Sequence, residues 1–149
     1  MRHRGTAQLT ALKHAMFERH SNPWSAWTRW LSTPLILVPF WTRRWSHAAP
    51  VAAWMLVNPI VFRKPASDEA WATRAVLGEE MWIGQRPRDL AAVVNVAATV
   101  CAAGAVFAAR RRRLVPAAAL TAVQMALVMG YWQLMAEYYD ERRDVEPRS

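Results

Sequence analysis

Five polar residues are the candidates for chemistry in this sequence: His20, Asn22, Asn58, Arg74 and Glu79. A histidine or a carboxylate can serve as a general base, and a guanidinium can hold an anion through paired hydrogen bonds. With His20 or Glu79 as the base and Arg74 as the anion holder, the cluster would suit an enzyme acting on a lipid or amphiphile. The other interpretation is a polar cluster that joins helices or binds a small ligand.

The sequence carries no stronger catalytic or metal-binding pattern. It lacks paired histidines at i and i+4, a glycine-rich phosphate loop and a nucleophile elbow. The single cysteine, Cys101, lies in an apolar run and provides neither a disulfide nor a metal cluster. We therefore predict no metal and no cofactor. A non-enzymatic scaffold, accessory subunit or small-ligand binder is the preferred class, and a membrane-surface enzyme is the alternative.

The elements that must position these residues are dominated by a hairpin of two apolar runs. Leu90–Ala109 and Leu114–Ala136 contain no acidic or basic side chain, and each supplies the roughly 20 apolar residues that cross a bilayer as a helix. Arg110–Arg113 cannot lie in hydrocarbon, so they predict a tight turn at a membrane surface. Arginines at span ends collect on the cytoplasmic side. We therefore predict a multi-pass protein of the cell (plasma) membrane with this turn in the cytoplasm.

Composition agrees with a membrane protein that meets anionic lipid. Hydrophobic residues make up 54% of the chain, yet the mean hydropathy is only −0.04, because charged residues lie outside the apolar runs. The net charge is +8. The basic residues adjoin apolar segments, so lipid headgroups are the expected partner, and nucleic acid is not, because no reading motif accompanies the charge.

The first half of the chain predicts two further apolar helices. Asn22 or Ser21 caps a helix that has Pro23 in its first turn, and Trp24, Trp27 and Trp30 follow at three-residue spacing as an aromatic anchor. Residues 24–45 are long enough to span, with arginines at both ends. Residues 45–62 form the next segment, which we expect to end or bend at Asn58, before a proline.

Charge and segment length favour different topologies for residues 24–62. A single crossing with a re-entrant first helix puts the basic N-terminus in the cytoplasm, as the positive-inside rule prefers. Two crossings put it outside, beside Asn58 and Glu79, and only this arrangement permits a shared polar site. In both cases residues 63–89 and the C-terminus are external, and Asp68–Ile83 is an amphipathic helix lying in the membrane plane.

The predicted fold is therefore all-α: four apolar helices, three of them spanning and the first spanning or re-entrant, plus one interfacial helix. Residues 1–23 are interpreted as an N-terminal surface helix, with Met16 as an alternative initiator that would leave out the first fifteen residues. Residues 24–136 form the membrane domain, and residues 137–149 form a polar tail.

Small residues predict how the hairpin packs. Ala118, Ala122, Ala126 and Gly130 recur every four residues, and so do Ala97, Cys101, Ala105 and Ala109. Such ridges allow close backbone approach in membranes. We expect the two helices to pack along them, and further copies or other subunits to use the same faces. Polar residues at mid-depth should bond across helices: Asn95, Thr99, Thr121 and Gln124.

Arg74 needs an acceptor outside its own helix. Arg74 and Glu79 are separated by about 140° of helical arc, so they do not pair as i, i+4 neighbours. The expected acceptors for Arg74 are the carbonyls around Asn58-Pro59, the Asn22 amide or a lipid phosphate.

Three motifs carry a resemblance to a known family. They are His20-Ser21-Asn22-Pro23-Trp24-Ser25 with Trp27-Thr28-Arg29, Asn58-Pro59-x-x-Phe62, and Trp71-x-x-Arg74-x-x-Leu77-Gly78-Glu79. Together they resemble a family of small prokaryotic integral membrane proteins known only as a domain of unknown function. The resemblance implies a polytopic helical membrane protein and brings no activity or cofactor with it.

Overall fold

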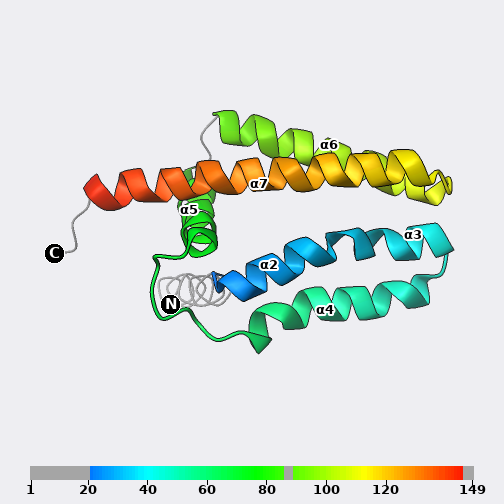
Figure 1. Cartoon of the computed structure of the whole chain (residues 1–149), viewed down its shortest axis with the longest axis horizontal. Coiled ribbons are helices and arrows are strands. Elements are labelled where there is room, and N and C mark those ends of the chain that lie inside the picture. The colour runs from blue at the N-terminus through cyan, green and yellow to red at the C-terminus, as the bar shows by residue number, and fades with distance from the viewer. Residues whose placement is uncertain (1–20, 86–88, 146–149) are drawn as a thin grey trace, which may run out of the picture.

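The computed structural model describes residues 21–85 and 89–145, which are all-helical and contain no strand. Figure 1 shows two long helical hairpins side by side, with one shorter helix running across one end. The prediction of an all-α fold is confirmed. In chain order the elements are α2 (Pro23–Ser32), η1 (Thr33–Leu37), α3 (Val38–Thr42), η2 (Trp45–His47), α4 (Ala48–Val61), α5 (Trp71–Gln85), α6 (Leu90–Arg110) and α7 (Leu114–Val145).

The hairpin of α6 and α7 turns at the four arginines, as predicted. The Asp89 side chain caps α6 by accepting from the Ala92 backbone N–H at 3.0 Å. At the other end Arg112 adopts a left-handed conformation with φ 55°, and its N–H donates to the carbonyl of Ala109 at 2.8 Å. Both helices are long and apolar enough to cross a membrane.

The helix α7 extends well past residue 136, where we expected a polar tail to begin. It continues to Val145. Tyr139 is buried within this extension, and its hydroxyl donates to the Asp68 carboxylate at 2.7 Å. The polar residues of the extension are therefore part of the folded unit, because they meet the loop before α5.

The small-residue ridge of α7 does not pack against α6. All four of its members are exposed, and a Cβ on Gly130 would meet nothing within 4 Å. The buried face of α7 is instead formed by the residues that precede Ala118 and Ala122 in the sequence, which are Ala117 and Thr121. Alanines occupy several neighbouring faces of α7, so a four-residue spacing did not identify which face is covered. The exposed residues are Ala118, Ala122, Ala126 and Gly130.

Two of the mid-depth hydroxyls bond to their own helix rather than across helices. Thr99 donates to the carbonyl of Asn95 at 2.9 Å, and Thr121 donates to the carbonyl of Ala117 at 2.8 Å. A threonine hydroxyl reaches the carbonyl four residues earlier without any partner helix. The cross-helix prediction is therefore wrong for these two residues.

Residues 23–61 form the other hairpin. Asn22 caps α2 by accepting from the Trp24 N–H at 2.9 Å, with Pro23 in the first turn, as predicted. Pro34 and Pro39 stand at the starts of η1 and α3. The first arm of the hairpin therefore passes from α-helix to 3-10 helix and back to α-helix, but it keeps the same direction. The chain turns at Arg43, which is left-handed with φ 55°, and returns as α4. The helix α4 continues through Asn58 to Val61, so it does not end at Asn58.

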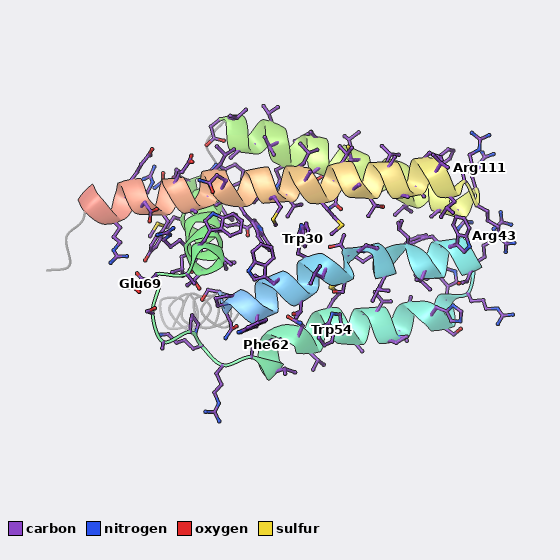
Figure 2. All side chains as sticks on the ribbon, viewed as in Figure 1. Trp30, Arg43, Trp54, Phe62, Glu69 and Arg111 are labelled. Atoms are coloured by element: carbon purple, nitrogen blue, oxygen red, sulfur yellow. The ribbon has the colours of Figure 1, made fainter. Side chains whose placement is uncertain are left out.

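The two hairpin turns lie together at one end of the molecule. The Arg43 guanidinium donates to the carbonyl of Arg110 at 3.1 Å, where it also faces the negative end of the α6 dipole. Figure 2 shows Arg43 and Arg111 at this end. The alanines 108, 109 and 117 form a small core beneath the turns, covered by Leu37, Phe40 and Trp41.

The helix α5 runs across the opposite end and is seen almost end-on in Figure 1. It begins at Trp71 rather than at the expected Asp68. Its apolar face, predicted to meet the membrane or the helix bundle, packs on α7: Ala75 joins Tyr131, Met135 and Ala136 in a second core. Most of this face is therefore covered by protein.

Candidate functional site

The site begins where α5 crosses α7 at Gly78. A Cβ on Gly78 would overlap the carbonyl oxygen of Met135 and lie 2.8 Å from its carbon, so only glycine permits this crossing. The close approach brings the next residue, Glu79, against α7. The Tyr131 hydroxyl donates to the Glu79 carboxylate at 3.3 Å. Glu79 is thus a partly buried acid at the junction of two helices.

Arg29 on α2 faces the same carboxylate. Its Nε donates to the carbonyl of Ser25 at 3.3 Å, which directs the side chain along its own helix. The charges of Arg29 and Glu79 attract each other. Two opposite charges 50 positions apart in the sequence therefore lie near each other, and both line the same cavity.

A cavity of about 310 Å³ adjoins this pair. Arg29 and Glu79 are the charged residues on its wall, and the remainder is largely apolar and aromatic. A small amphiphilic molecule would fit such a space, because apolar walls with a few convergent polar groups are typical of ligand sites. The other lining residues are Trp30, Thr33, Ile36, Met55, Val76, Val128 and Trp132.

Burial decides the protonation behaviour of Glu79. Desolvation raises the pKa of the Glu79 carboxyl above its ordinary value, since the protein interior disfavours the charged form. The hydrogen bond from Tyr131 and the charge of Arg29 oppose this shift and offset part of it. The carboxyl can therefore hold or release a proton at a higher pH than an exposed glutamate.

Four tryptophans pack together beside the site, and two of them, Trp30 and Trp132, line its cavity. Trp27 stacks on Trp71 with ring centroids 5.8 Å apart, and Trp132 meets both rings edge-on at 6.3 and 6.0 Å. The Trp30 indole N–H donates to the carbonyl of Met125 at 3.1 Å. This aromatic group, which joins α2, α5 and α7, fixes the helix that carries Arg29. Trp24, by contrast, is 71% exposed and stands apart.

Asn58 holds α2 from the other side. It is fully buried, its carboxamide oxygen accepts from the Ser25 hydroxyl at 2.7 Å, and its amide group donates to the Thr28 hydroxyl at 2.8 Å. Asn22 adds a second link by donating to the carbonyl of Arg63 at 2.7 Å. The two asparagines thus position the helix on which Arg29 stands.

The chain as a whole was compared with known proteins. A model of one protein family matches residues 3–149. The chain belongs to DUF6653, a family of unknown function. No curated protein and no solved structure matched the chain at a significant level. The resemblance inferred from the motifs is therefore confirmed at the level of a domain of unknown function.

In this DUF6653 chain the four predicted residues that the structure describes do not form one cluster. Asn22 and Asn58 both contact the first hairpin, while Glu79 faces Tyr131 and Arg29. Arg74 lies outside the site, because its Nε is 3.6 Å from the Asp140 carboxylate on α7. Asp140 was not among the expected acceptors, since residues 137–149 were predicted to form a tail. His20 lies outside the described residues.

Two contributors to the DUF6653 site are not evident from the sequence: Tyr131 and Trp132 stand within an apolar run, where a phenol and an indole look like further hydrophobic residues. Arg29 was expected near a membrane surface, but its approach to Glu79 was not. The Trp27-Thr28-Arg29 motif was the available signal, since its threonine and arginine both turn out to be engaged. Among the described residues, no group of three potential ligands is arranged to hold a metal ion.

Proposed function

We propose that this protein is a multi-pass membrane protein that binds a small amphiphile in the cavity beside Arg29 and Glu79. The membrane part rests on the outer surface of the helices. In the apolar windows of α6 and α7 only 17% of residues are buried in the protein, unlike those of a soluble core helix. Exposed side chains along α6 include Val93, Val96, Val100 and Phe107. Such a surface needs lipid to cover it.

The first hairpin would cross the same bilayer. In Figure 1 the arm of α2, η1 and α3 lies next to α7, the arm of α4 runs along its far side, and Leu35, Leu56 and Val61 expose apolar side chains. With about 1.5 Å of rise per helical residue, an arm of roughly 20 residues covers a hydrocarbon core of about 30 Å. Two crossings for residues 24–62 are thus the arrangement that we propose, and the N-terminus then lies on the side of α5.

Charge sets the orientation of the proposed span. Both hairpin turns together carry six arginines and no acidic residue, while the acidic residues of 68–85, 89 and 137–145 belong to the other end. The positive-inside rule then puts the arginine turns in the cytoplasm and the C-terminus outside. The plasma membrane is the compartment that this orientation suits.

A binding role is favoured over catalysis by the separation of the candidate catalytic groups. An enzyme using Glu79 as base and Arg74 as anion holder would need both at one substrate, but Arg74 faces Asp140. Arg29 and Glu79 instead lie near each other on the wall of a largely apolar cavity. A ligand with a polar head could exchange hydrogen bonds with this pair while its apolar part contacts Trp30 and Trp132.

Orientation can be tested with a reporter that is active only in the cytoplasm. Fused after Ser149, it should give no signal. Single cysteines offer an independent measurement in a Cys101→Ala background: a membrane-impermeant maleimide should label Glu141→Cys in intact cells and Ser46→Cys only after lysis. Both positions are exposed. A strong reporter signal, or labelling of Ser46→Cys in intact cells, would reverse the proposed topology.

Ligand binding can be tested by native mass spectrometry of the purified protein. The wild type should retain a bound small molecule, and Arg29→Gln or Glu79→Gln should lose it. Arg74→Gln and Glu137→Gln are matched controls, since they remove the same charges outside the cavity. Retention in all four variants, or no adduct in the wild type, would contradict a ligand site at this pair.

A further inference from the structure

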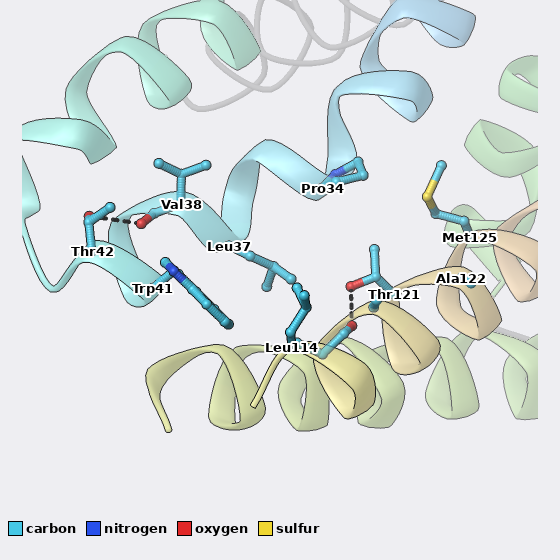
Figure 3. A pocket seen from close by; sticks show the side chains of 11 residues that line it. Pro34, Leu37, Val38, Trp41, Thr42, Leu114, Thr121, Ala122 and Met125 are labelled. Atoms are coloured by element: carbon cyan, nitrogen blue, oxygen red, sulfur yellow. Dashed lines mark hydrogen bonds between the residues drawn. The ribbon is translucent and has the colours of Figure 1, made fainter. Parts of the chain in front are cut away.

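A second, larger cavity lies at the other end of the molecule, between the first hairpin and α7. It is an open groove of about 430 Å³. Figure 3 shows Leu37 and Trp41 on one wall and Leu114 and Met125 on the other. Almost all of its surface is carbon, so its shape and chemistry suit a hydrocarbon chain rather than a polar ligand.

The hydroxyls that reach this groove are already engaged. Thr42 donates to the carbonyl of Val38 at 2.9 Å, and Thr121 donates to the carbonyl of Ala117 at 2.8 Å. Both bonds are drawn in Figure 3. Each threonine therefore satisfies its hydroxyl on its own helix and adds no free polar group to the wall.

The groove ends beside the arginine turns. Thr42 immediately precedes Arg43 and Arg44, and Leu114 immediately follows Arg110–Arg113, so both walls run into a cluster of positive charge. Arg44 and Arg113 are exposed. A guanidinium binds a phosphate through paired hydrogen bonds, which a neutral polar group cannot reproduce.

We propose that this groove holds one acyl chain of an anionic phospholipid whose phosphate binds Arg44 and Arg113. The proposal rests on the membrane insertion proposed above, since an acyl chain enters the groove from a bilayer. Charge complementarity selects the occupant: the groove supplies an apolar channel and the turns supply cations at its mouth. Anionic lipids are abundant on the cytoplasmic side, where the arginine turns are proposed to lie.

A second copy of the chain is the competing occupant. The groove wall includes Ala118 and Ala122, whose small side chains would allow close helix contact. Two copies meeting groove to groove about an axis along the membrane normal would use the same patch twice. That arrangement brings two arginine clusters together, and like charges oppose it. An anionic lipid neutralises the same cluster and is therefore favoured.

Quenching of Trp41 tests the lipid site directly. The protein is reconstituted into phosphatidylcholine vesicles that contain a small fraction of bromine-labelled chains, carried either by phosphatidylglycerol or by phosphatidylcholine. Flotation with the vesicles first establishes insertion, so a failure of the membrane proposal is seen before any lipid preference is measured. The signal is the quenching that Trp41→Phe removes.

We expect this quenching to reach half its maximum at a severalfold lower fraction of labelled phosphatidylglycerol than of labelled phosphatidylcholine. A surface arginine contributes about a fivefold preference for anionic lipid. Arg44→Gln and Arg113→Gln should each reduce the preference by roughly that factor. Arg63→Gln, an exposed arginine outside the hairpin turns, should leave it unchanged.

Filling the groove provides the second arm. Ala122→Phe should abolish the Trp41-dependent quenching, whereas Ala119→Phe, at an exposed position that does not line the groove, should preserve it. Equal quenching by both lipids would mean ordinary boundary lipid and would overturn the proposal. A crosslinked dimer that forms in the wild type and is lost in Ala122→Phe would also overturn the proposal, because a second copy of the chain would then occupy the groove.

Discussion

The backbone at Gly78 lies directly against the carbonyl of Met135, with no room for a side chain between them. This contact lets α5 cross α7 closely enough for Glu79 to meet Tyr131. The glycine therefore acts on the candidate ligand site through geometry, although it lines no part of the cavity. Its neighbours in the motif, Leu77 and Glu79, would be displaced by any residue that separates the two helices.

Gly78→Ala should destabilise the protein strongly. The added methyl overlaps backbone rather than a flexible side chain, so α5 must move, and overpacking of this kind costs about 1–3 kcal/mol or more. We expect a large fall in melting temperature in detergent. Gly84→Ala is the control: a Cβ there meets nothing within 4 Å, and alanine favours the helix by about 1 kcal/mol. Equal behaviour of the two variants would contradict the close crossing.

The second hairpin could be predicted from sequence because its signal is local. Two long apolar runs separated by consecutive arginines leave few alternatives, and the turn and both helices were found as expected, except that α7 continues to Val145. The face on which α6 and α7 meet was not predictable from spacing. Alanine occupies several faces of α7, and the choice between them depends on where α3 and η1 pack.

The candidate site was harder to predict because its residues are far apart in sequence. Glu79 was identified from its motif, but its partners Tyr131 and Arg29 come from two other helices. Asn58 looked like a helix end and is instead a buried connector to Ser25 and Thr28. In each case the residue type was informative, while the partner depended on the packing of whole hairpins.

Replacing Asn58 should loosen the first hairpin. Asn58→Ala leaves the buried Ser25 hydroxyl without its acceptor, which costs about 1–3 kcal/mol, while the Thr28 hydroxyl keeps its bond to the Trp24 carbonyl. Combining it with Ser25→Ala should cost less than the two separate changes added together, because the same bond is lost twice. The measurement is thermal stability in detergent, with Thr99→Val, an exposed hydroxyl, as the control. Strict additivity would argue against the Ser25–Asn58 bond.

Arg74 should tolerate replacement by lysine. Its ion pair with Asp140 spans 3.6 Å between partly exposed side chains, and such pairs contribute about 0–1 kcal/mol. Arg74→Lys should therefore be nearly neutral, and Arg74→Ala should cost less than about 1 kcal/mol, with a difference that shrinks in high salt. A large loss in Arg74→Lys would instead indicate a two-bond site that needs the guanidinium fork.

The buried and exposed alanines of the second hairpin should respond differently to leucine. Ala109 is fully buried against α3, so Ala109→Leu overpacks the core and should lower stability by about 1–3 kcal/mol. Ala126 is exposed, and Ala126→Leu should leave monomer stability unchanged. If Ala126→Leu alters the oligomeric mass in detergent, the exposed ridge serves as a contact between subunits. Equal destabilisation by both would show that Ala126 is covered within one chain.

Glu79 should make stability fall as pH rises. Its pKa in the folded protein is raised by burial above the ordinary value of 4.5. Below 4.5 both the folded and the unfolded chain hold the proton, so the folded state keeps its full stability. As the pH rises, the unfolded chain ionises first, and stability is lost until the pH passes the raised folded pKa.

Glu79→Gln should remove this decline, so that the stability of the variant rises relative to that of the wild type above pH 4.5. Unfolding followed across this range, with the exposed Glu137→Gln as control, measures the difference. If Glu79→Gln and the wild type keep the same pH slope, the folded carboxyl does not titrate above its ordinary value.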